Sequence, residues 1–252
     1  MPLFTMEEPQ PKLTTPIKNW REDMPNNHEP QLVPPQLRWL TMLNDIFLEV
    51  PLYSSIVWGG MLASAVLMFI LGVVVGAFGF VIQGGYDDYA MTAIGLGGAF
   101  IFFCLMLFCL KMYFVQPRDQ PIRLNRKRQK IYIFEYKHTF LPWRKWTTTI
   151  RSYNWADVRG EIRYSSARYD SGYQLFGSVC EPGTNKVVTR FLIAKERSSQ
   201  EMLCQIWSYL SVYMQHDSVT ADPVETGRPD DWRPRKADRW PEDMERESTT
   251  AP

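Results

Sequence analysis

The side chains that could take part in catalysis are few and lie far apart in this sequence. The three histidines are His28, His138 and His216, and no HExxH motif or Cys/His cluster suggests a metal site. Asp157 and Glu161 lie four residues apart, which on a strand places both carboxylates on one face, where they could act as general acid and base. Surface charge is the simpler interpretation of this pair, and of His138 at the end of a predicted strand.

Motifs of nucleotide and ester chemistry are absent from the chain. It contains no GxGxxG, GxxxxGK[ST] or GxSxG sequence. The four cysteines form no CxxC pair, so we expect small buried thiols in a reducing compartment rather than a disulfide framework. The sequence therefore predicts a protein that is not an enzyme, with no catalytic residue, no cofactor and no metal.

The charged residues are distributed unevenly. Residues 116–214 contain 17 basic and 8 acidic residues, whereas residues 217–252 contain 6 basic and 10 acidic residues. A basic cluster follows the second of two long apolar runs, and we expect it to set topology and to contact anionic headgroups. The cluster comprises Arg118, Arg123, Arg126, Lys127, Arg128 and Lys130. Because membrane placement accounts for these charges, we expect no nucleic-acid binding.

The two apolar runs, residues 56–82 and 90–110, contain no Asp, Glu, Lys, Arg or His. About 20 apolar helical residues span a hydrocarbon core, so residues 54–115 are predicted to form a two-helix transmembrane hairpin. Basic residues follow the second run, which predicts cytoplasmic N- and C-termini. No secretory signal is present, and the absence of ionisable groups in the spans argues against transport.

Small residues recur at helical spacing within both spans. Gly72 and Gly76 form a GxxxG motif, and Gly95 and Ala99 lie four residues apart. Small residues allow helix backbones to approach closely in lipid. They predict either packing of the two spans on each other or homo-oligomerisation through the same face.

The first 51 residues are predicted to form two segments. Residues 1–34 are rich in proline and polar residues, which predicts disorder. Residues 35–51 carry apolar side chains every three or four positions, which predicts an amphipathic interfacial helix. This helix would lie either on the inner face of the membrane or on the soluble domain.

Residues 118–216 have the pattern of a small α+β domain. From residue 121 the apolar period changes to two, and about five strands follow within about 70 residues, typical of an antiparallel meander. Ser198 and Glu201 form a capping box, followed by residues with one apolar helical face. The predicted fold is thus a membrane helical hairpin plus an antiparallel β-meander closed by a C-terminal helix.

The last segment, residues 217–252, is predicted to be a disordered tail. Trp232 and Trp240 each precede a proline within two residues in a repeated Trp–Pro pattern. Short aromatic motifs in tails often dock on partners, so these two residues are candidates for partner docking. A solvated tail with incidental tryptophans is the alternative.

The order of these segments resembles a known family. The sequence Asn-Arg-Lys-Arg-Gln-Lys-Ile-Tyr at residues 125–132 and Trp-Ala-Asp-Val at residues 155–158 are similar to motifs of a proteobacterial family of two-pass inner-membrane proteins. That family is of unknown function and occurs near type VI secretion and polymorphic-toxin genes. The layout after the hairpin also resembles bacterial pleckstrin-homology-like domains. The resemblance covers about residues 35–215 and implies location in a bacterial inner membrane.

These observations together predict a non-catalytic membrane protein whose cytoplasmic domain binds a protein partner. The resemblance implies an immunity or accessory protein in interbacterial competition, with a toxin or secretion component as partner. The alternative is a lipid-sensing or scaffolding module that binds anionic headgroups of the bilayer.

Overall fold

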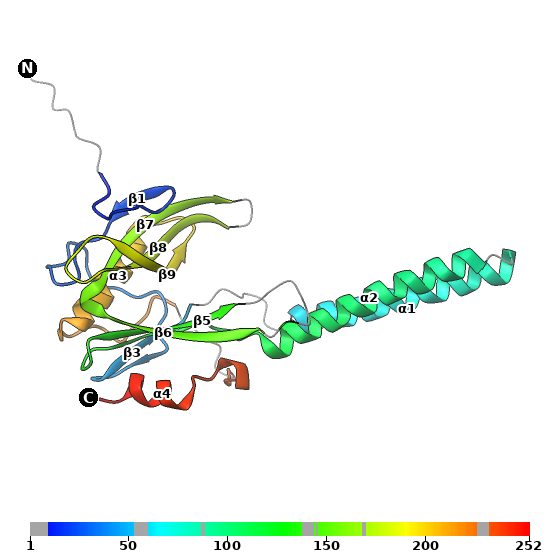
Figure 1. Cartoon of the computed structure of the whole chain (residues 1–252). Coiled ribbons are helices and arrows are strands. Elements are labelled where there is room, and N and C mark those ends of the chain that lie inside the picture. Colours follow the sequence, from blue (N-terminus) through cyan, green and yellow to red (C-terminus); the bar gives the residue numbers. More distant parts are fainter. Residues whose placement is uncertain are drawn as a thin grey trace, which may run out of the picture.

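The computed structural model consists of a long helical hairpin and a body built on two β-sheets (Figure 1). It describes residues 10–52, 60–86, 89–137, 144, 146–167, 170–225 and 232–252. The hairpin comprises α1 (Gly60–Tyr86) and α2 (Tyr89–Val115), which pack side by side and project from the body.

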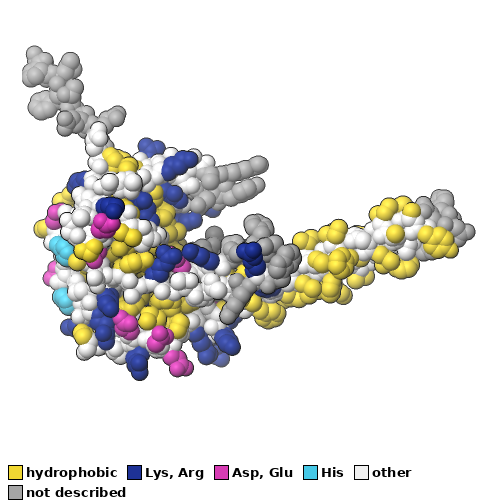
Figure 2. Space-filling view, in the orientation of Figure 1, with side chains coloured by type: hydrophobic (Ala, Val, Ile, Leu, Met, Phe, Trp, Pro, Cys, Tyr) yellow, Lys and Arg dark blue, Asp and Glu magenta, His cyan; other side chains and the backbone are white. Residues whose placement is uncertain are grey.

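Both helices of the hairpin are long and apolar enough to cross a membrane. The apolar segments are Gly60–Val81 and Tyr89–Val115, of 22 and 27 residues. At about 1.5 Å per residue each exceeds the roughly 30 Å of a hydrocarbon core. Their side chains point outward over most of the surface, as the apolar atoms along the hairpin in Figure 2 show. Such exposure suits a lipid environment.

The first sheet has five strands in the order β2-β3-β4-β5-β6, and all neighbours pair antiparallel. The strands are β2 (Met42–Leu43), β3 (Phe47–Val50), β4 (Ile122–Asn125), β5 (Lys130–Lys137) and β6 (Thr147–Asn154). Val50 is paired with Ile122, so the hairpin is inserted between two neighbouring strands.

The helix predicted over residues 35–51 is wrong, because β2 and β3 occupy its second half and no helix is present in its first half. All four residues of β3 are buried, from Phe47 to Val50. Pairing with β4 therefore overrides the helical spacing, as tertiary context commonly does for short apolar segments.

The second sheet has four strands in the order β1-β7-β8-β9. They are β1 (Trp20–Asp23), β7 (Val158–Ala167), β8 (Asp170–Cys180) and β9 (Val187–Glu196). The 3₁₀ turn η1 (Trp155–Asp157) leads directly from β6 into β7 and so joins the two sheets. The meander is thus divided between two antiparallel sheets rather than forming one.

The predicted disorder of residues 1–34 is wrong for the described part, residues 10–34. Leu13, Ile17 and Met24 are buried, and β1 forms an edge of the second sheet. The Asn27 amide is fully buried and donates to the carbonyl oxygens of Trp155 and Val158. A few buried side chains thus fix a proline-rich segment whose composition alone predicts disorder.

A single long helix follows the sheets, as predicted. This helix, α3 (Gln200–Met214), packs against strands of both sheets. Its N-cap is Ser199, whose side chain accepts from the backbone N–H of Met202, one residue later than the predicted cap at Ser198. Its buried face joins the inner faces of both sheets in one core, which includes Leu124, Ile162 and Trp207.

The predicted boundaries of the soluble domain, residues 118–216, are too narrow. Strands β1 to β3 add to its sheets from the N-terminal side, and the chain continues past residue 216 along its surface. The predicted disorder of residues 217–252 is wrong for the described residues 217–225 and 232–252. The latter contain the 3₁₀ turn η2 (Lys236–Asp238) and helix α4 (Glu242–Thr249), which lies against the first sheet (Figure 1).

Candidate functional site

The candidate site is the outer face of the first sheet, on which the end of the chain lies. Alternation along β3, β4 and β5 sends Leu48, Leu124 and Ile131 into the core and their neighbours to the other side. We call this other side the docking face, and it comprises Glu49, Arg123, Asn125, Lys130, Tyr132 and Phe134. We call residues 232–252 the tail segment.

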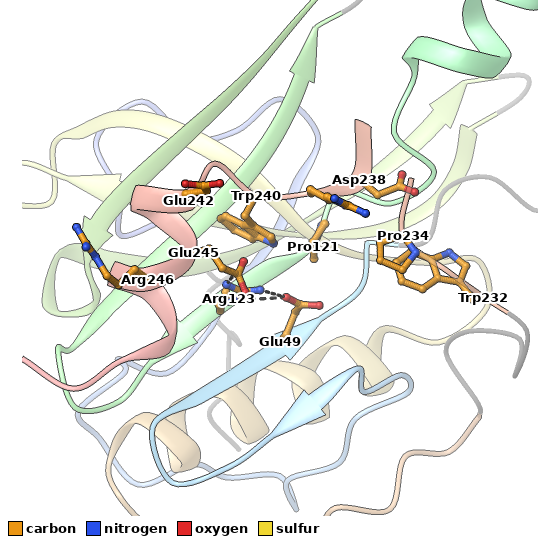
Figure 3. Close-up of a pocket in the computed structure, with 11 residues that line it drawn as sticks. Glu49, Pro121, Arg123, Trp232, Pro234, Asp238, Trp240, Glu242, Glu245 and Arg246 are labelled. Carbon is orange, nitrogen blue, oxygen red and sulfur yellow. Dashed lines mark hydrogen bonds and ion pairs between the residues drawn. The ribbon is translucent and has the colours of Figure 1, made fainter. Parts of the chain in front are cut away.

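Arg123 is the central residue of the docking face. It is only 4% exposed, and its Nε and Nη2 donate to Oε2 of Glu49 at 3.0 and 2.5 Å. Its Nη1 donates to Glu245 at 3.0 Å and to the hydroxyl of Ser248 at 2.7 Å. The guanidinium also lies 4.5 Å from the ring centroid of Trp240. One buried cation therefore joins β3, β4 and α4 (Figure 3).

The backbone of the tail segment is held by side chains of the β4–β5 hairpin. The Asn125 amide donates to the carbonyl oxygens of Ser248 and Thr250 at 3.0 and 2.9 Å. Arg128 donates to the carbonyls of Thr250 and Ala251 at 3.0 and 2.8 Å. No further helical turn follows α4 to donate hydrogen bonds to these carbonyls, so Asn125 and Arg128 supply the missing donors. These side chains therefore recognise mainly the backbone of the tail segment.

A carboxylate of α4 is recognised by Lys130 and Tyr132. Both donate to Oε1 of Glu247, each at 3.0 Å. These hydrogen bonds, from Lys130 first and then Tyr132, lower the pKa of Glu247. Burial, together with the acceptor at Glu247, raises the pKa of the Tyr132 hydroxyl. The site therefore favours a charged carboxylate at this position.

The first half of the tail segment contacts both the sheet and the end of α2. Trp240 packs edge-on against Phe134, with ring centroids 5.4 Å apart. Asp238 accepts from the backbone N–H of Arg118 at 2.7 Å and forms an ion pair with its guanidinium at 3.0 Å. Arg235 donates to the carbonyl of Tyr113 at 2.7 Å. The tail segment thus extends from the exit of the hairpin to the far end of the sheet.

A pocket of about 470 Å³ lies between the tail segment and the docking face (Figure 3). Trp232 and Trp240 line it from the tail segment, and Glu49 and Arg123 line it from the sheet. The tail segment does not fill the space above the sheet.

The predicted membrane-surface cluster is divided by the fold. Arg118 lies beside the end of α2, but Arg123 is buried under the tail segment, so its predicted place on a membrane-facing surface is wrong. Arg128 and Lys130 also contact the tail segment. Arg126 lies over the ring of Tyr213, and Lys127 is exposed in the β4–β5 turn.

The β4–β5 turn also lies far from the hairpin. Trp146, next to the first residue of β6, packs against Phe108 of α2, whereas Lys130 pairs with Asn154 at the other end of β6. Eight strand residues separate these ends, about 25 Å at 3.3 Å per residue. Most of the basic cluster therefore lies at the end of the sheet remote from the exit of α2.

The small residues predicted for helix packing lie at the contact between α1 and α2. A Cβ on Gly72 would lie 3.5 Å from the backbone oxygen of Ala99, and one on Gly76 would lie 3.4 Å from the Ala99 side chain. A Cβ on Gly95 would lie 2.8 Å from the Cα atom of Gly79. The backbones of the two helices thus approach closely at two glycines, one of which, Gly79, was not among the predicted residues.

The predicted acid–base pair is not assembled. Asp157 lies in η1 rather than on a strand, so it does not share a strand face with Glu161. Glu161 is fully buried, so its interpretation as surface charge is wrong. It accepts hydrogen bonds from Ser178 and, at 2.6 Å, from Arg190, which also donates to the Thr15 carbonyl of the N-terminal segment.

Within the described residues, the other candidate groups do not come together in a catalytic or metal-binding site. The described residues include no group of three or more His, Cys, Asp or Glu that could hold a metal ion. Burial raises the pKa of the Cys180 thiol and raises that of Cys204 to about 11, which disfavours reactive thiolates there. His138 lies outside the described residues.

Fold and site define an α+β protein with an apolar helical hairpin inserted between two strands and its C-terminal end bound to its own sheet. The chain belongs to DUF6708, a family of unknown function, whose sequence profile matches residues 99–232. The match begins within α2, covers β4 to β9 and α3, and ends at Trp232. No curated protein and no solved structure matches the chain.

Proposed function

We propose that this chain is a non-catalytic, two-pass membrane protein whose body binds a protein partner through the docking face. The observation that carries this proposal is that the face already holds a peptide, the tail segment, by three kinds of contact. Arg123 and Lys130 bind carboxylates, Asn125 donates hydrogen bonds to backbone carbonyls, and Phe134 packs against an aromatic ring. A segment of another protein with these groups would find the same contacts.

The insertion point of the hairpin supports a membrane location close to this face. Because β3 and β4 pair directly, the chain leaves and re-enters the same sheet on either side of the two helices. The body would thus lie on one side of the bilayer, and the basic residues after α2 favour the cytoplasmic side. The family resemblance of residues 125–132 supports a role as an immunity or accessory protein in interbacterial competition.

Binding of anionic lipid headgroups is less well supported as a function. Arg118, Arg123, Arg128 and Lys130 are all engaged by the tail segment. Flotation of the full chain with anionic and neutral vesicles separates the proposals. Selective, salt-sensitive flotation with anionic vesicles would favour the lipid interpretation.

Site-specific photo-crosslinking in native membranes tests the protein-binding proposal. Ser152 is exposed on β6 and pairs with Tyr132, so it lies beside the docking face. Val188 is 64% exposed on β9 of the second sheet and provides the control position. With p-benzoylphenylalanine at each position in turn, we expect a protein adduct from Ser152→p-benzoylphenylalanine only. No adduct at either position, or the same adducts at both, would count against this surface.

A further inference from the structure

We propose that the tail segment is a displaceable internal ligand that occludes the docking face, and that the partner presents the same chemistry. That chemistry is a tryptophan followed, five and seven residues later, by carboxylates on a short helix, as in Trp240, Glu245 and Glu247. This inference rests on the proposed function and names both the partner segment and its regulation.

The tail segment contributes no residue to the hydrophobic core cluster. The core cluster draws its residues from β3 to β9, α3 and the segments before them, and it includes no residue of 232–252. Trp240, the largest apolar side chain in the contact with β5, is only partly buried. The core cluster therefore keeps all its members when the tail segment leaves, whereas Tyr132 and Phe134, which are 0% and 1% exposed, become accessible.

The two ion pairs that the carboxylates of α4 form with the docking face are individually weak. The carboxylate of Glu245 is 49% exposed and that of Glu247 is 31% exposed, and ion pairs of this kind contribute little because water screens them. Helix α4 has eight residues, too few to be stable without the sheet beneath it. At Arg123 and Lys130, a competing segment therefore has only modest interactions with α4 to replace.

The docking face remains intact after release, because its buried cation has a second partner. Arg123 keeps both hydrogen bonds to Glu49 when Glu245 and Ser248 leave. No uncompensated charge is then left buried. An uncovered face would present Lys130 and Tyr132 for a carboxylate and Phe134 for an aromatic ring.

Electrostatics favours an acidic occupant of this face. Helix α4 carries four acidic residues and one basic residue. Within the docking face, Glu49 is neutralised by Arg123, and Lys130 has its acidic partner in the tail segment. An acidic segment from a partner would replace these pairs one for one, whereas a basic segment would not.

Peptide exchange tests the proposal on the full chain in detergent micelles. The probe is a fluorescein-labelled synthetic peptide of residues 236–252, and its binding is followed by fluorescence anisotropy. A tethered tail competes at an effective concentration on the order of millimolar. We therefore expect at least roughly tenfold tighter peptide binding to a Trp240→Ala/Glu247→Gln chain, whose own tail is weakened, than to the unaltered chain.

Two matched controls define the site of exchange. Adding Lys130→Gln to the weakened chain should abolish the gain, because it removes a partner of the peptide's Glu247 carboxylate. A peptide carrying Trp240→Ala should bind neither chain. Equal binding of the original peptide to both chains would show that the face is not occluded, and binding to neither would show that it does not accept such segments.

A second readout needs no variant of the chain. Tryptic cleavage after Arg246, an exposed residue of α4, should accelerate when excess unlabelled peptide is added to the unaltered chain. An unchanged cleavage rate would overturn displacement of the tail segment. The crosslinks at Ser152 report a partner independently, so failure of exchange leaves protein binding standing and removes only the role of the tail segment.

Discussion

Arg123 illustrates how one residue makes this surface both stable and capable of binding. Its guanidinium is satisfied on one side by Glu49 within the sheet and on the other by Glu245 and Ser248 of the tail segment. The first partner is buried and the second is half exposed. The two interactions therefore have different roles, one in stability and the other in docking.

We expect Arg123→Met to destabilise the body by roughly 3–5 kcal/mol, because it leaves the buried carboxylate of Glu49 without its partner. Glu245→Gln should change the free energy of unfolding by less than about 1 kcal/mol, because that carboxylate is half exposed. Thermal or denaturant unfolding of the two variants in detergent gives the comparison. Similar losses for both would mean that the tail segment is part of the folded core.

At the residue scale, docking of the tail segment should also depend on pH. The pKa of Glu247 is lowered from 4.5 in the docked state by Lys130 and Tyr132. A lowered pKa contributes stability that is present above pH 4.5 and is lost as the pH falls through the docked value. Fluorine NMR of 5-fluorotryptophan at Trp240 should therefore report release in this range. Lys130→Gln should reduce the pH dependence, and an identical titration would assign it to another group.

At the scale of elements, the sequence predicted those whose pattern is decided locally. The two apolar helices, the strands from β5 onward and α3 follow from period and composition. Strand β3 and the ordered structure of residues 10–34 were not predicted from the sequence. Both depend on partners far along the chain, such as β4 and the backbone around Trp155. The docking face was likewise not predicted. The excess of acidic residues after residue 217, next to a basic domain, could have indicated that the two segments bind each other.

The α1–α2 contact is an element whose tightness can be tested with two neighbouring glycines. A Cβ on Gly95 would lie 2.8 Å from Gly79 Cα, whereas a Cβ on Gly97 meets nothing within 4 Å. We expect Gly95→Ala to destabilise the hairpin by about 1–3 kcal/mol through overpacking, and Gly97→Ala to leave it unchanged. Cysteine crosslinking between α1 and α2 measures the difference. Equal effects would show that the contact has room to adjust.

At the scale of the whole molecule, the insertion of the hairpin connects the two apolar helices directly to the docking face. The paired strands β3 and β4 lead into and out of the hairpin, and β4 also carries Arg123. Arg118 and Tyr113, at the end of α2, hold the first half of the tail segment. The exit of the hairpin is therefore in direct contact with the tail segment, which covers the docking face.

This arrangement predicts which positions share a side of the membrane. Leu32 precedes the hairpin and is 88% exposed, and Val188 follows it and is 64% exposed. Because the hairpin leaves and re-enters one sheet, Leu32→Cys and Val188→Cys should react with an impermeant maleimide from the same side. Tyr89→Cys, at the start of α2 and remote from the body, should react from the opposite side.

The measurement uses intact cells, spheroplasts and inverted vesicles of a chain in which the four native cysteines are replaced by serine or alanine. The proposed topology, which rests on the excess of basic residues after α2, predicts that Leu32→Cys and Val188→Cys label only in inverted vesicles. Labelling of the two positions from opposite sides is incompatible with pairing of β3 and β4 across the hairpin. Labelling of all three from one side would mean that the hairpin lies on the membrane without crossing it, and the docking face would then have to be placed against the lipid surface rather than beside it.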